Sequence, residues 1–258
     1  MTNDIKKWFL KVVKTLGGFV VVLIIWQFVH SLSLLEPTLF PSPKRTFETL
    51  FNIIAAGNIL LDLSVTIIRM LAGLGLAVIF GVIFGLSIGL IKPLYESAEG
   101  VIDFFRSIPV TTLYPIFVLL FGIGHSSKIA MVFWASFFVI ALNTAYGVIQ
   151  STKVRRKVAK LYGASNIQIF KWITFFDALP QTLIGIRVAI SFSLIVEILC
   201  EMFMGSEYGI GQRITESFTT YAIPELYALI LLSGILGFSF NRLFVVFEKK
   251  LVPWVGKL

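Results

Sequence analysis

Apolar residues fall into six long runs along the chain, and short polar or basic segments separate these runs. A helix needs about 20 mostly apolar residues to cross the hydrocarbon core of a bilayer, and each run is near or above that length. The candidate spans are residues 16–34, 63–91, 99–121, 128–149, 180–204 and 224–247. The pattern therefore predicts an all-α, polytopic membrane protein with about six transmembrane helices.

Two of these runs depart from a simple crossing. Residues 63–91 are long for one span, so we expect this helix to tilt or to project from the bilayer. Asp103, Arg106 and Pro109 interrupt residues 99–121, which makes this span the least regular of the six.

Glycines in the second run are spaced so that several share a helix face. Gly81, Gly85 and Gly89 follow one another at intervals of four residues, and Gly73 precedes them. Small residues on one face let two helices approach closely in lipid. The spacing favours a helix-packing face over a conformational hinge.

Composition agrees with a membrane protein and excludes several other classes. Of 258 residues, 57% are hydrophobic and only 14% are charged, which leaves too few polar side chains to cover a soluble domain of this size. The single Cys200 cannot form an intramolecular disulfide. The net charge of +8 is typical of basic cytoplasmic loops in a membrane chain, so we expect no nucleic-acid partner.

Lys and Arg concentrate in the N-terminal segment, in residues 150–172 and in the C-terminal tail. Cytoplasmic loops carry an excess of these residues, so the asymmetry predicts that both termini are cytoplasmic. The predicted divisions are a cytoplasmic N-terminus (1–15), a first span (16–34), an external connector (35–62), a core domain of five helices (63–247) with a cytoplasmic loop at 151–178, and a cytoplasmic tail (248–258).

One cytoplasmic stretch, KLYGASNIQIFKWITFFDALPQT at residues 160–182, is half polar in a mostly apolar chain. Residues 151–172 place apolar positions at near-helical spacing, with basic residues between them. Two interpretations are open from the residues alone. The stretch is either an interfacial helix on anionic lipid headgroups or a docking element for a cytoplasmic partner.

Small residues interrupt this stretch at Gly163, Ala164 and Ser165. They permit a sharp turn and let another surface approach the backbone, which predicts a short helix, a tight turn and a second helix. We expect Leu179 and Pro180 to end the segment and to begin the next span, because proline is tolerated in the first turn of a helix.

This stretch resembles the coupling loop of permease subunits from binding-protein-dependent ATP-binding-cassette (ABC) importers. The matching positions are Gly163, Ala164, Ser165, Phe170, Leu179 and Pro180. Three further segments are similar to motifs of that family: SVTIIRMLAGLGLAVIFGVIFGLSIGL, FRSIPVTTLYPIFVLLFGIGHSSKIAM and GIRVAISFSLIVEILCEMFMGSEYGIG. With the closing LVPW, they resemble the branch that imports nitrate, sulfonates, taurine or pyrimidine precursors.

The first half of the loop departs from the family pattern. That pattern begins with Glu-Ala-Ala, whereas Lys157, Val158 and Ala159 occupy these positions here, so that only Ala159 matches. A partner's matching surface is therefore expected to differ in charge.

The resemblance implies the type I importer permease fold in a bacterial plasma (inner) membrane, surrounded by lipid. It also implies a cytoplasmic ABC ATPase, an external solute-binding protein and a second permease copy, most simply in a homodimer. The sequence contains no Gly-x-x-x-x-Gly-Lys-Ser/Thr phosphate loop, so ATP-Mg is expected on the ATPase and no cofactor in this chain. No catalytic residues and no metal ligands are expected.

Ionisable residues within or near the spans are the remaining candidates for a site, since such residues usually face a bundle interior or a wet cavity. They are Arg106, Arg187, Glu197 and Glu201. Two interpretations are open: a translocation path or gate, and structural ion pairs that fix packing. Arg69, early in its span, is expected to snorkel to the membrane surface, and His30 and His125 have no metal-ligand neighbours.

Among the carboxylates, we expect Glu201 to matter more than Glu197. Glu201 lies where the family pattern places its Glu, just before the glycine-rich MGSEYGIG. It can accept hydrogen bonds from free backbone N–H groups of a tight turn there and hold an external gate in shape. The alternative is an acid that faces the surface at the end of the span.

Two other classes of membrane protein are considered. A secondary transporter would use Glu197 and Glu201 for ion coupling, but the coupling-loop resemblance counts against it. A membrane-embedded enzyme would need a catalytic set, and the sequence shows no His cluster, nucleophile motif or metal-ligand spacing.

Overall fold

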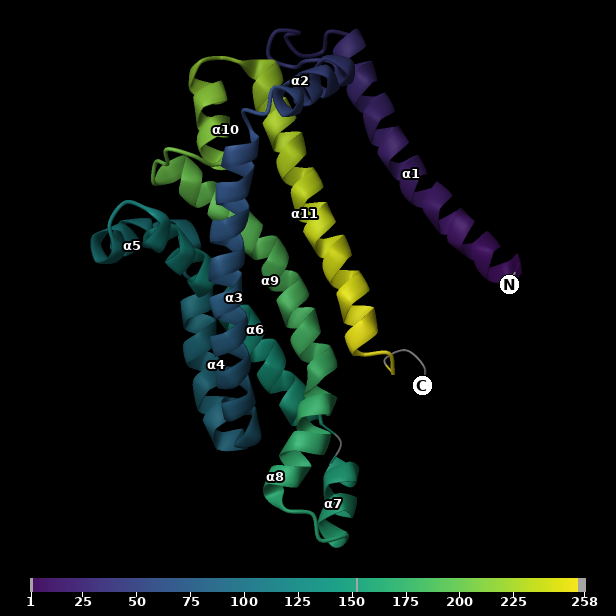
Figure 1. Ribbon diagram of the computed structural model, residues 1–258, viewed down its shortest axis with the longest axis vertical. Helices are drawn as coiled ribbons and strands as arrows, with labels where there is room; N and C mark the ends of the chain where they lie inside the picture. The colour runs from purple at the N-terminus through teal and green to yellow at the C-terminus, as the bar shows by residue number, and fades with distance from the viewer. Residues whose placement is uncertain (1, 152, 255–258) are drawn as a thin grey trace. The chain divides into compact units, whose positions relative to one another are not determined.

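The computed structural model describes residues 2–151 and 153–254, with the side chains of residues 2–16 and 153 outside this description. The secondary structure of the described residues is helical (Figure 1). The helices are α1 (Thr2–Ser31), α2 (Pro43–Ala55), α3 (Leu60–Leu90), α4 (Lys92–Ser107), the 3₁₀ turn η1 (Val110–Leu113), α5 (Tyr114–Phe121), α6 (His125–Gln150), α7 (Lys153–Leu161), α8 (Asn166–Ile169), the π turn η2 (Phe170–Thr174), α9 (Phe175–Phe203), α10 (Ile210–Thr219) and α11 (Ile223–Leu251).

Four helical stretches in the described residues are long and apolar enough to cross a membrane. They are Leu60–Leu90, His125–Gln150, Asn166–Phe203 and Ile223–Leu251, which confirms four of the predicted spans. The apolar part of α1, Gly17–Ser31, is shorter, so a first span at 16–34 stays a prediction. The basic residues predicted to hold residues 1–15 in the cytoplasm lie outside the described side chains.

The span predicted at 99–121 is not one straight helix. The pair Lys92–Ser107 and Val110–Phe121 bends by 82° and counts as a fifth crossing only if the two parts form one broken span. Ile108 and Pro109 are extended at the break, with ψ of 120° and 125°. A proline disfavours helical geometry in the residue before it, so the break lies where the sequence places Pro109.

The chain divides into two compact units, each described by itself. The first contains the residues up to Leu60 together with Arg213–Leu232. Here the link between α1 and α2 is held by Trp26, whose Nε1 donates to the Pro41 carbonyl at 3.0 Å, and by His30, whose Nδ1 lies 2.8 Å from the Phe40 carbonyl oxygen.

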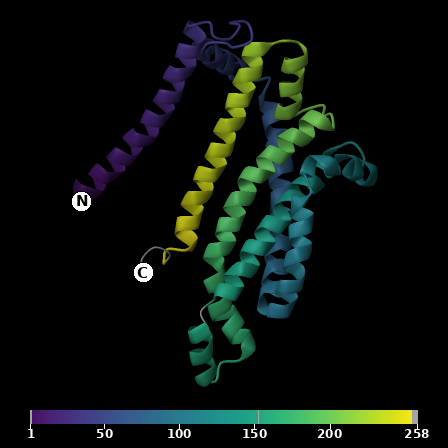
Figure 2. The same ribbon diagram turned by 180° about the vertical axis from the view of Figure 1, so that it is seen from behind.

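The second unit, Leu61–Gln212 with the residues from Ser233 on, has α3, α6 and α9 side by side at its centre (Figures 1 and 2). A Cβ atom added at Gly73 would lie 2.7 Å from Val132 Cβ of α6, and one at Gly89 would lie 2.8 Å from the Ala145 carbonyl oxygen. Neither contact leaves room for a side chain. The glycines of α3 are therefore a packing face against α6, as their spacing predicts.

The loop predicted at residues 151–178 is a helical hairpin in this second unit. After α7, Gly163 takes a φ of +80°, and Ser165 caps α8 by accepting from the Gln168 N–H at 3.3 Å. The Gln168 side chain accepts from the Ser165 N–H at 2.8 Å, which completes a capping box. The structure confirms the predicted helix, turn and second helix.

The expected helix boundary at Leu179 and Pro180 is wrong. The helix runs without interruption from Asn166 to Phe203, through the π turn, and Pro180 lies inside α9. A proline within a helix removes a single backbone donor, and in this long, well-packed helix the loss does not break it. The loop and the following span are therefore one continuous helix.

Candidate functional site

A short turn segment, Gly205–Gly209, joins α9 to α10 in the second unit. Gly205 and Gly209 have φ values of +68° and +141°, which residues other than glycine rarely adopt. The segment is followed at once by the N-terminus of α10, whose first backbone N–H groups have no partner within the helix. The residues that bind this segment define the candidate site.

Acceptors from other helices satisfy three successive N–H groups at the start of α10. Gly209 N donates to Asp62 Oδ1 at 2.8 Å, and Ile210 N donates to Thr66 Oγ1 at 3.0 Å. Gly211 N donates to Glu201 Oε2 at 2.9 Å. A carboxylate near a helix N-terminus is also stabilised by the positive end of the helix dipole.

Glu201 is the most fully bonded of these acceptors. It has no exposed surface, and besides Gly211 it accepts from the Thr66 hydroxyl at 2.9 Å and from Arg69 Nη1 at 2.9 Å. This confirms that Glu201 accepts a backbone N–H bond next to the glycine-rich segment. The alternative of a surface-facing acid is wrong.

Two buried cations bind the other side of the turn segment. Arg69 Nη1 donates to Ser206 Oγ at 3.0 Å and to the Tyr208 carbonyl at 3.1 Å, and its Nε lies 2.9 Å from His125 Nδ1. Lys128 Nζ donates to the Gly205 carbonyl at 2.9 Å. Acceptors on three residues of the segment, Gly205, Ser206 and Tyr208, therefore bind cations.

The expectation that Arg69 snorkels to the surface is wrong. Only 4% of Arg69 and 1% of Lys128 are exposed. Arg69 turns inward because Glu201 and the turn segment offer it a charged partner and carbonyl oxygens within the protein. Sequence reasoning did not select Lys128. A basic residue just inside an apolar run, in a chain whose other spans contain carboxylates, is the signal that would have found it.

Glu197 differs from Glu201 in its bonding although it is equally buried. It lies one helical turn before Glu201, and Oε1 is 3.9 Å from Arg69 Nη1. Neither of its carboxyl oxygens has a hydrogen-bond donor in the described part of the chain. We call Asp62, Arg69, Lys128, Glu197 and Glu201 the buried cluster, and it holds three carboxyl groups against two cations. No group of three or more His, Cys, Asp or Glu residues within the described ranges is arranged to hold a metal ion.

The other two predicted path residues lie outside the buried cluster. Arg106 pairs with Asp103 on α4 at 3.3 Å, and both side chains are about half exposed. Arg187 of α9 pairs with Glu248 of α11. The structure therefore brings together Glu197 and Glu201 alone among the four predicted residues.

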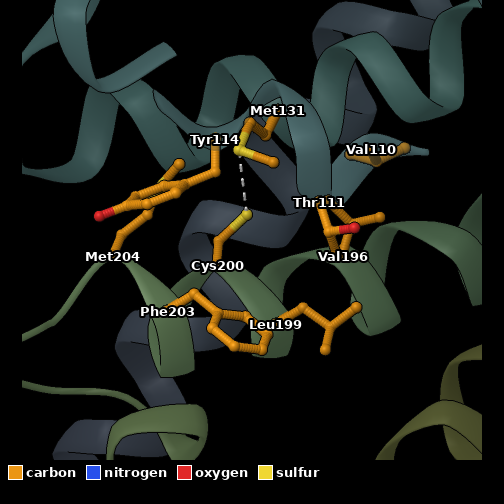
Figure 3. A pocket seen from close by; sticks show the side chains of 9 residues that line it. All are labelled: Val110, Thr111, Tyr114, Met131, Val196, Leu199, Cys200, Phe203 and Met204. Atoms are coloured by element: carbon orange, nitrogen blue, oxygen red, sulfur yellow. Dashed lines mark hydrogen bonds between the residues drawn. The ribbon is translucent and has the colours of Figure 1, made fainter. Parts of the chain in front are cut away.

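An apolar cavity of about 170 Å³ lies in the second unit (Figure 3). Side chains of α9 face those of η1, α5 and α6 across it, and the Cys200 thiol points to Met131 Sδ at 3.6 Å. The lining residues are Val110, Thr111, Tyr114, Met131, Val196, Leu199, Cys200, Phe203 and Met204. The cavity lining is mostly apolar and contains no charged side chain.

The hairpin of α7 and α8 exposes apolar side chains at its tip. Leu161 is 87% exposed and Tyr162 is 89% exposed, and Ile167 of α8 is also exposed. Of the predicted coupling residues, Lys157, Gly163 and Ser165 are exposed, and Ala159, Ala164, Phe170, Leu179 and Pro180 are half-buried.

Two basic side chains tie the hairpin to the spans. Arg155 Nη1 lies 2.8 Å from Asp177 Oδ1 at the start of α9, and Arg156 Nη2 donates to the Val148 carbonyl of α6 at 2.7 Å. The hairpin is thus attached to both neighbouring helices by charge-assisted hydrogen bonds.

Solved structures of transporters have a similar fold. A chain of the MetNI methionine ABC transporter in an inward-facing conformation matches with a TM-score of 0.59 at 18% identity, over 70% of this chain and 92% of that chain. A chain of an amino acid ABC transporter matches with a TM-score of 0.55, over 78% of this chain and 98% of that chain. At this identity the likeness concerns the fold.

Curated proteins are similar over nearly the whole chain. The taurine transport system permease protein TauC of Escherichia coli is 26% identical over 253 residues, which cover 96% of this chain and 92% of that protein. The nitrate import permease protein NrtB of Synechocystis sp. is 25% identical, over 94% of this chain and 90% of that protein. The formylaminopyrimidine transport permease protein ThiX of Halalkalibacterium halodurans is 26% identical, over 93% and 94%.

The sequence profile of one family, described as "Binding-protein-dependent transport system inner membrane component", matches residues 77–255. This match covers more than half of the sequence and includes the hairpin of α7 and α8, α9 and the turn segment. The chain is therefore a multi-pass inner-membrane protein that belongs to the permeases of binding-protein-dependent ABC importers.

Proposed function

We propose that this permease forms the membrane path for a small solute that an external binding protein delivers and that a separate ATPase drives inward. The observation that carries the proposal is the exposed apolar tip of the α7–α8 hairpin, Leu161 and Tyr162. In Figure 1 the hairpin continues past the ends of α6 and α9. Large apolar side chains that project in this way need a protein surface to cover them.

The hairpin supports a docking role over a lipid-bound one. An interfacial helix lies in the plane of the membrane with its apolar face in the lipid. Here α8 continues directly into the span α9, and the most exposed apolar residues lie at the turn between α7 and α8. We therefore assign the hairpin to a cytoplasmic ABC ATPase, with ATP-Mg bound on that partner. The basic Lys157 and Lys160 beside the tip favour an acidic rim on the partner's cleft.

A continuous helix links this docking site to the buried cluster. The stretch Asn166–Phe203 contains 38 residues, which at 1.5 Å per residue is about 57 Å long. A displacement of the hairpin by the closing ATPase would travel along this helix to Glu197 and Glu201 as a rigid-body shift. Because Glu201 holds the start of α10, the shift would act on the turn segment.

The remaining features of the assembly follow from the family. We propose two permease copies in a homodimer, an inner membrane of a bacterium with both termini cytoplasmic, and a gate that includes Glu201. Relatives in the taurine, nitrate and formylaminopyrimidine systems support a small, polar solute as the cargo. Nitrate, a sulfonate, taurine or a pyrimidine precursor are the candidates to test.

The structure gives no support to a secondary transporter that uses Glu197 and Glu201 for ion coupling. Glu201 is occupied by Thr66, Arg69 and Gly211, and its bonds fix the start of α10. Membership in the ABC permease family excludes this alternative.

Purification of the chain from cells that also express its ATPase and binding protein tests the proposal. We expect the ATPase to co-purify with the chain. When the complex is placed in vesicles, it should take up one of the candidate solutes only if ATP is present on the side of the membrane where the ATPase is bound. Uptake without ATP, or a chain that never binds an ATPase, would contradict the proposal.

Gly163 offers a sharper variant with a matched control. Gly163→Leu combines bulk at the hairpin turn with a φ of +80° that leucine rarely adopts, so ATPase binding and uptake should both be lost. Gly57 has a φ of +73° and the same open surroundings, but lies in the predicted external connector. Gly57→Leu should leave ATPase binding intact. Equal binding by the Gly163→Leu variant and the unmodified chain would sink the docking assignment.

A further inference from the structure

A second cavity, of about 310 Å³, lies between α9 and α11 in the second unit. Its lining residues are Ser191, Gly237, Phe238, Asn241, Arg242 and Val245. A Cβ atom added at Gly237 would lie 3.2 Å from Leu194 Cδ2, so the two helices are in close contact next to the cavity. Polar side chains are unusual in such a place, because both helices belong to candidate membrane spans.

The polar groups of this cavity are hydrogen-bond donors that nothing in the described chain engages. The side chains of Ser191, Asn241 and Arg242 form no hydrogen bond or ion pair with any described residue. They offer a hydroxyl, an amide and a guanidinium group with five N–H donors. The lining contains no carboxylate.

The charge of Arg242 is also unbalanced in its surroundings. The nearest acidic residue along α11 is Glu248, which pairs with Arg187 of α9. This pair lies one helical turn before Ser191 on α9 and one turn after Val245 on α11, at the edge of the cavity. Because Glu248 neutralises Arg187, the cavity keeps one net positive charge from Arg242.

The depth of Arg242 in the span makes an unpaired charge costly. Arg242 lies nine residues before Leu251 at the end of α11, which is about 14 Å of helix. Ionisable side chains at such depth face a water-filled cavity or a partner and mark substrate pathways. A guanidinium without a counter-ion, beside two free donors, is complementary to a small oxoanion.

We propose that Ser191, Asn241 and Arg242 bind the anionic group of the transported solute on its way through the permease. The solute class is a small oxoanion such as a sulfonate, a carboxylate or nitrate, whose oxygens match the planar guanidinium fork. This inference rests on the proposed transport function and names the residues that recognise its cargo.

Cysteine labelling tests the site without measuring transport. In the complex in lipid nanodiscs, Asn241→Cys should react with an anionic methanethiosulfonate reagent, and methanesulfonate should slow this reaction whereas methylammonium should not. The unmodified chain is the control, because its single Cys200 is only 2% exposed. An Asn241→Cys variant that stays unlabelled would show that the cavity is not reached by water and would overturn the proposal.

Transport by substituted complexes gives the second test. Arg242→Gln should weaken the apparent affinity for the imported anion by about tenfold to a hundredfold, as expected for loss of a charged hydrogen-bonding group. The apparent affinity of the Arg242→Lys variant should lie between those of the Arg242→Gln variant and the unmodified chain, because lysine keeps the charge and loses the bidentate fork. Lys250→Gln, which removes a charge from the same helix outside the cavity, should match the unmodified chain.

The outcomes separate this inference from the proposed function and from lipid binding. If the unmodified complex takes up solute with ATP and Arg242→Gln does so with the same KM, the transport proposal stands and the anion site is wrong. If Arg242 instead holds a lipid phosphate, the effect of Arg242→Gln should vanish in bilayers without anionic lipid, and methanesulfonate should not slow the labelling of the Asn241→Cys variant. No uptake by the unmodified complex would count against the transport function itself.

Discussion

Glu201 accepts the backbone N–H of Gly211 at a distance of 2.9 Å, so a carboxylate at the end of one span caps the helix that follows it. The chain between these two residues folds back tightly, and Arg69 and Lys128 bind the carbonyl oxygens of the intervening turn segment. The buried cluster therefore fixes both ends of the turn. Any motion of α9 must move this segment or break these bonds.

Replacement of Glu201 by glutamine should reduce transport and stability more than the same change at Glu197. Thr66, Arg69 and Gly211 all donate to Glu201, so the amide NH₂ of glutamine must face a donor, and Arg69 loses the nearer of its two charged partners. Breaking a buried ion pair by removing one partner costs about 3–5 kcal/mol. We expect a lower melting temperature of the detergent-solubilised complex and slower uptake for Glu201→Gln, with the ATPase still bound.

Glu197→Gln is the matched comparison on the same helix. Glu197 accepts no hydrogen bond in the described chain, so its amide loses no bond that the carboxyl group had. Uptake and melting temperature should stay near those of the unmodified complex. Equal, unchanged transport in both variants would show that neither carboxyl group takes part in gating.

Gly209 should tolerate alanine far less well than Gly205. A Cβ atom at Gly209 would overlap the carboxyl group of Glu201, and its φ of +141° is one that alanine rarely adopts. At Gly205 the φ is +68° and no atom lies within 4 Å of the added Cβ. Gly205→Ala should therefore cost about 1 kcal/mol from backbone strain alone.

The comparison is made by thermal unfolding of the two purified variants and by uptake. Gly209→Ala should melt at a clearly lower temperature and lose most uptake, because the overlap displaces Glu201 from Gly211. If the two variants melt together, the contact between Gly209 and Glu201 does not determine the shape of the turn segment.

The spans were predictable from the sequence because their signal is local. Apolar length alone found the four long spans, and the spacing of Gly81, Gly85 and Gly89 found the packing face of α3 but not its partner helix α6. The turn at Gly163 was also predictable, since small residues and a Ser cap act within a few positions. The family motif, together with the glycines after Glu201, predicted a backbone partner for this carboxylate.

Other features depend on contacts between distant parts of the chain. Pro180 does not end a helix because packing of α9 against α6 outweighs the loss of one backbone bond. Arg69 is buried because its Nη1 lies 2.9 Å from the carboxylate of Glu201. The two residues are 132 positions apart in the sequence, so no local pattern shows this contact. The free donors around Arg242 were likewise invisible, because a sequence does not show which polar residues lack a partner.

The orientation of the chain stays a prediction, and reporter fusions test it. Fusions at residues 92 and 160 should report the cytoplasm, and fusions at 50 and 215 should report the external side. The reason is the excess of Lys and Arg in residues 150–172 and in the tail. An external signal at residue 160 would contradict the whole topology, since an ATPase could not reach the hairpin.

Lys128 should control the order of the turn segment without a direct role in solute binding. Its ammonium donates to the carbonyl of Gly205 at 2.9 Å, and Lys128→Met keeps the apolar stem while removing this donor. A hydrogen bond to a charged group contributes about 1.5–3 kcal/mol, so the Gly205 carbonyl should open to water much more often. Amide hydrogen exchange, followed by mass spectrometry, should become faster in residues 205–209 and stay unchanged in α7 and α8.

The control for this change is Lys249→Met, an exposed lysine in the last turn of α11. It removes the same charge but touches none of the turn segment, so exchange there should match the unmodified chain. Because Arg69 still binds Ser206 and Tyr208, the turn segment of the Lys128→Met variant should be loosened and not unfolded. Unchanged exchange in residues 205–209 would mean that Arg69 alone holds the segment. In that case, substitution of both Arg69 and Lys128 would speed exchange in the segment no more than substitution of Arg69 alone.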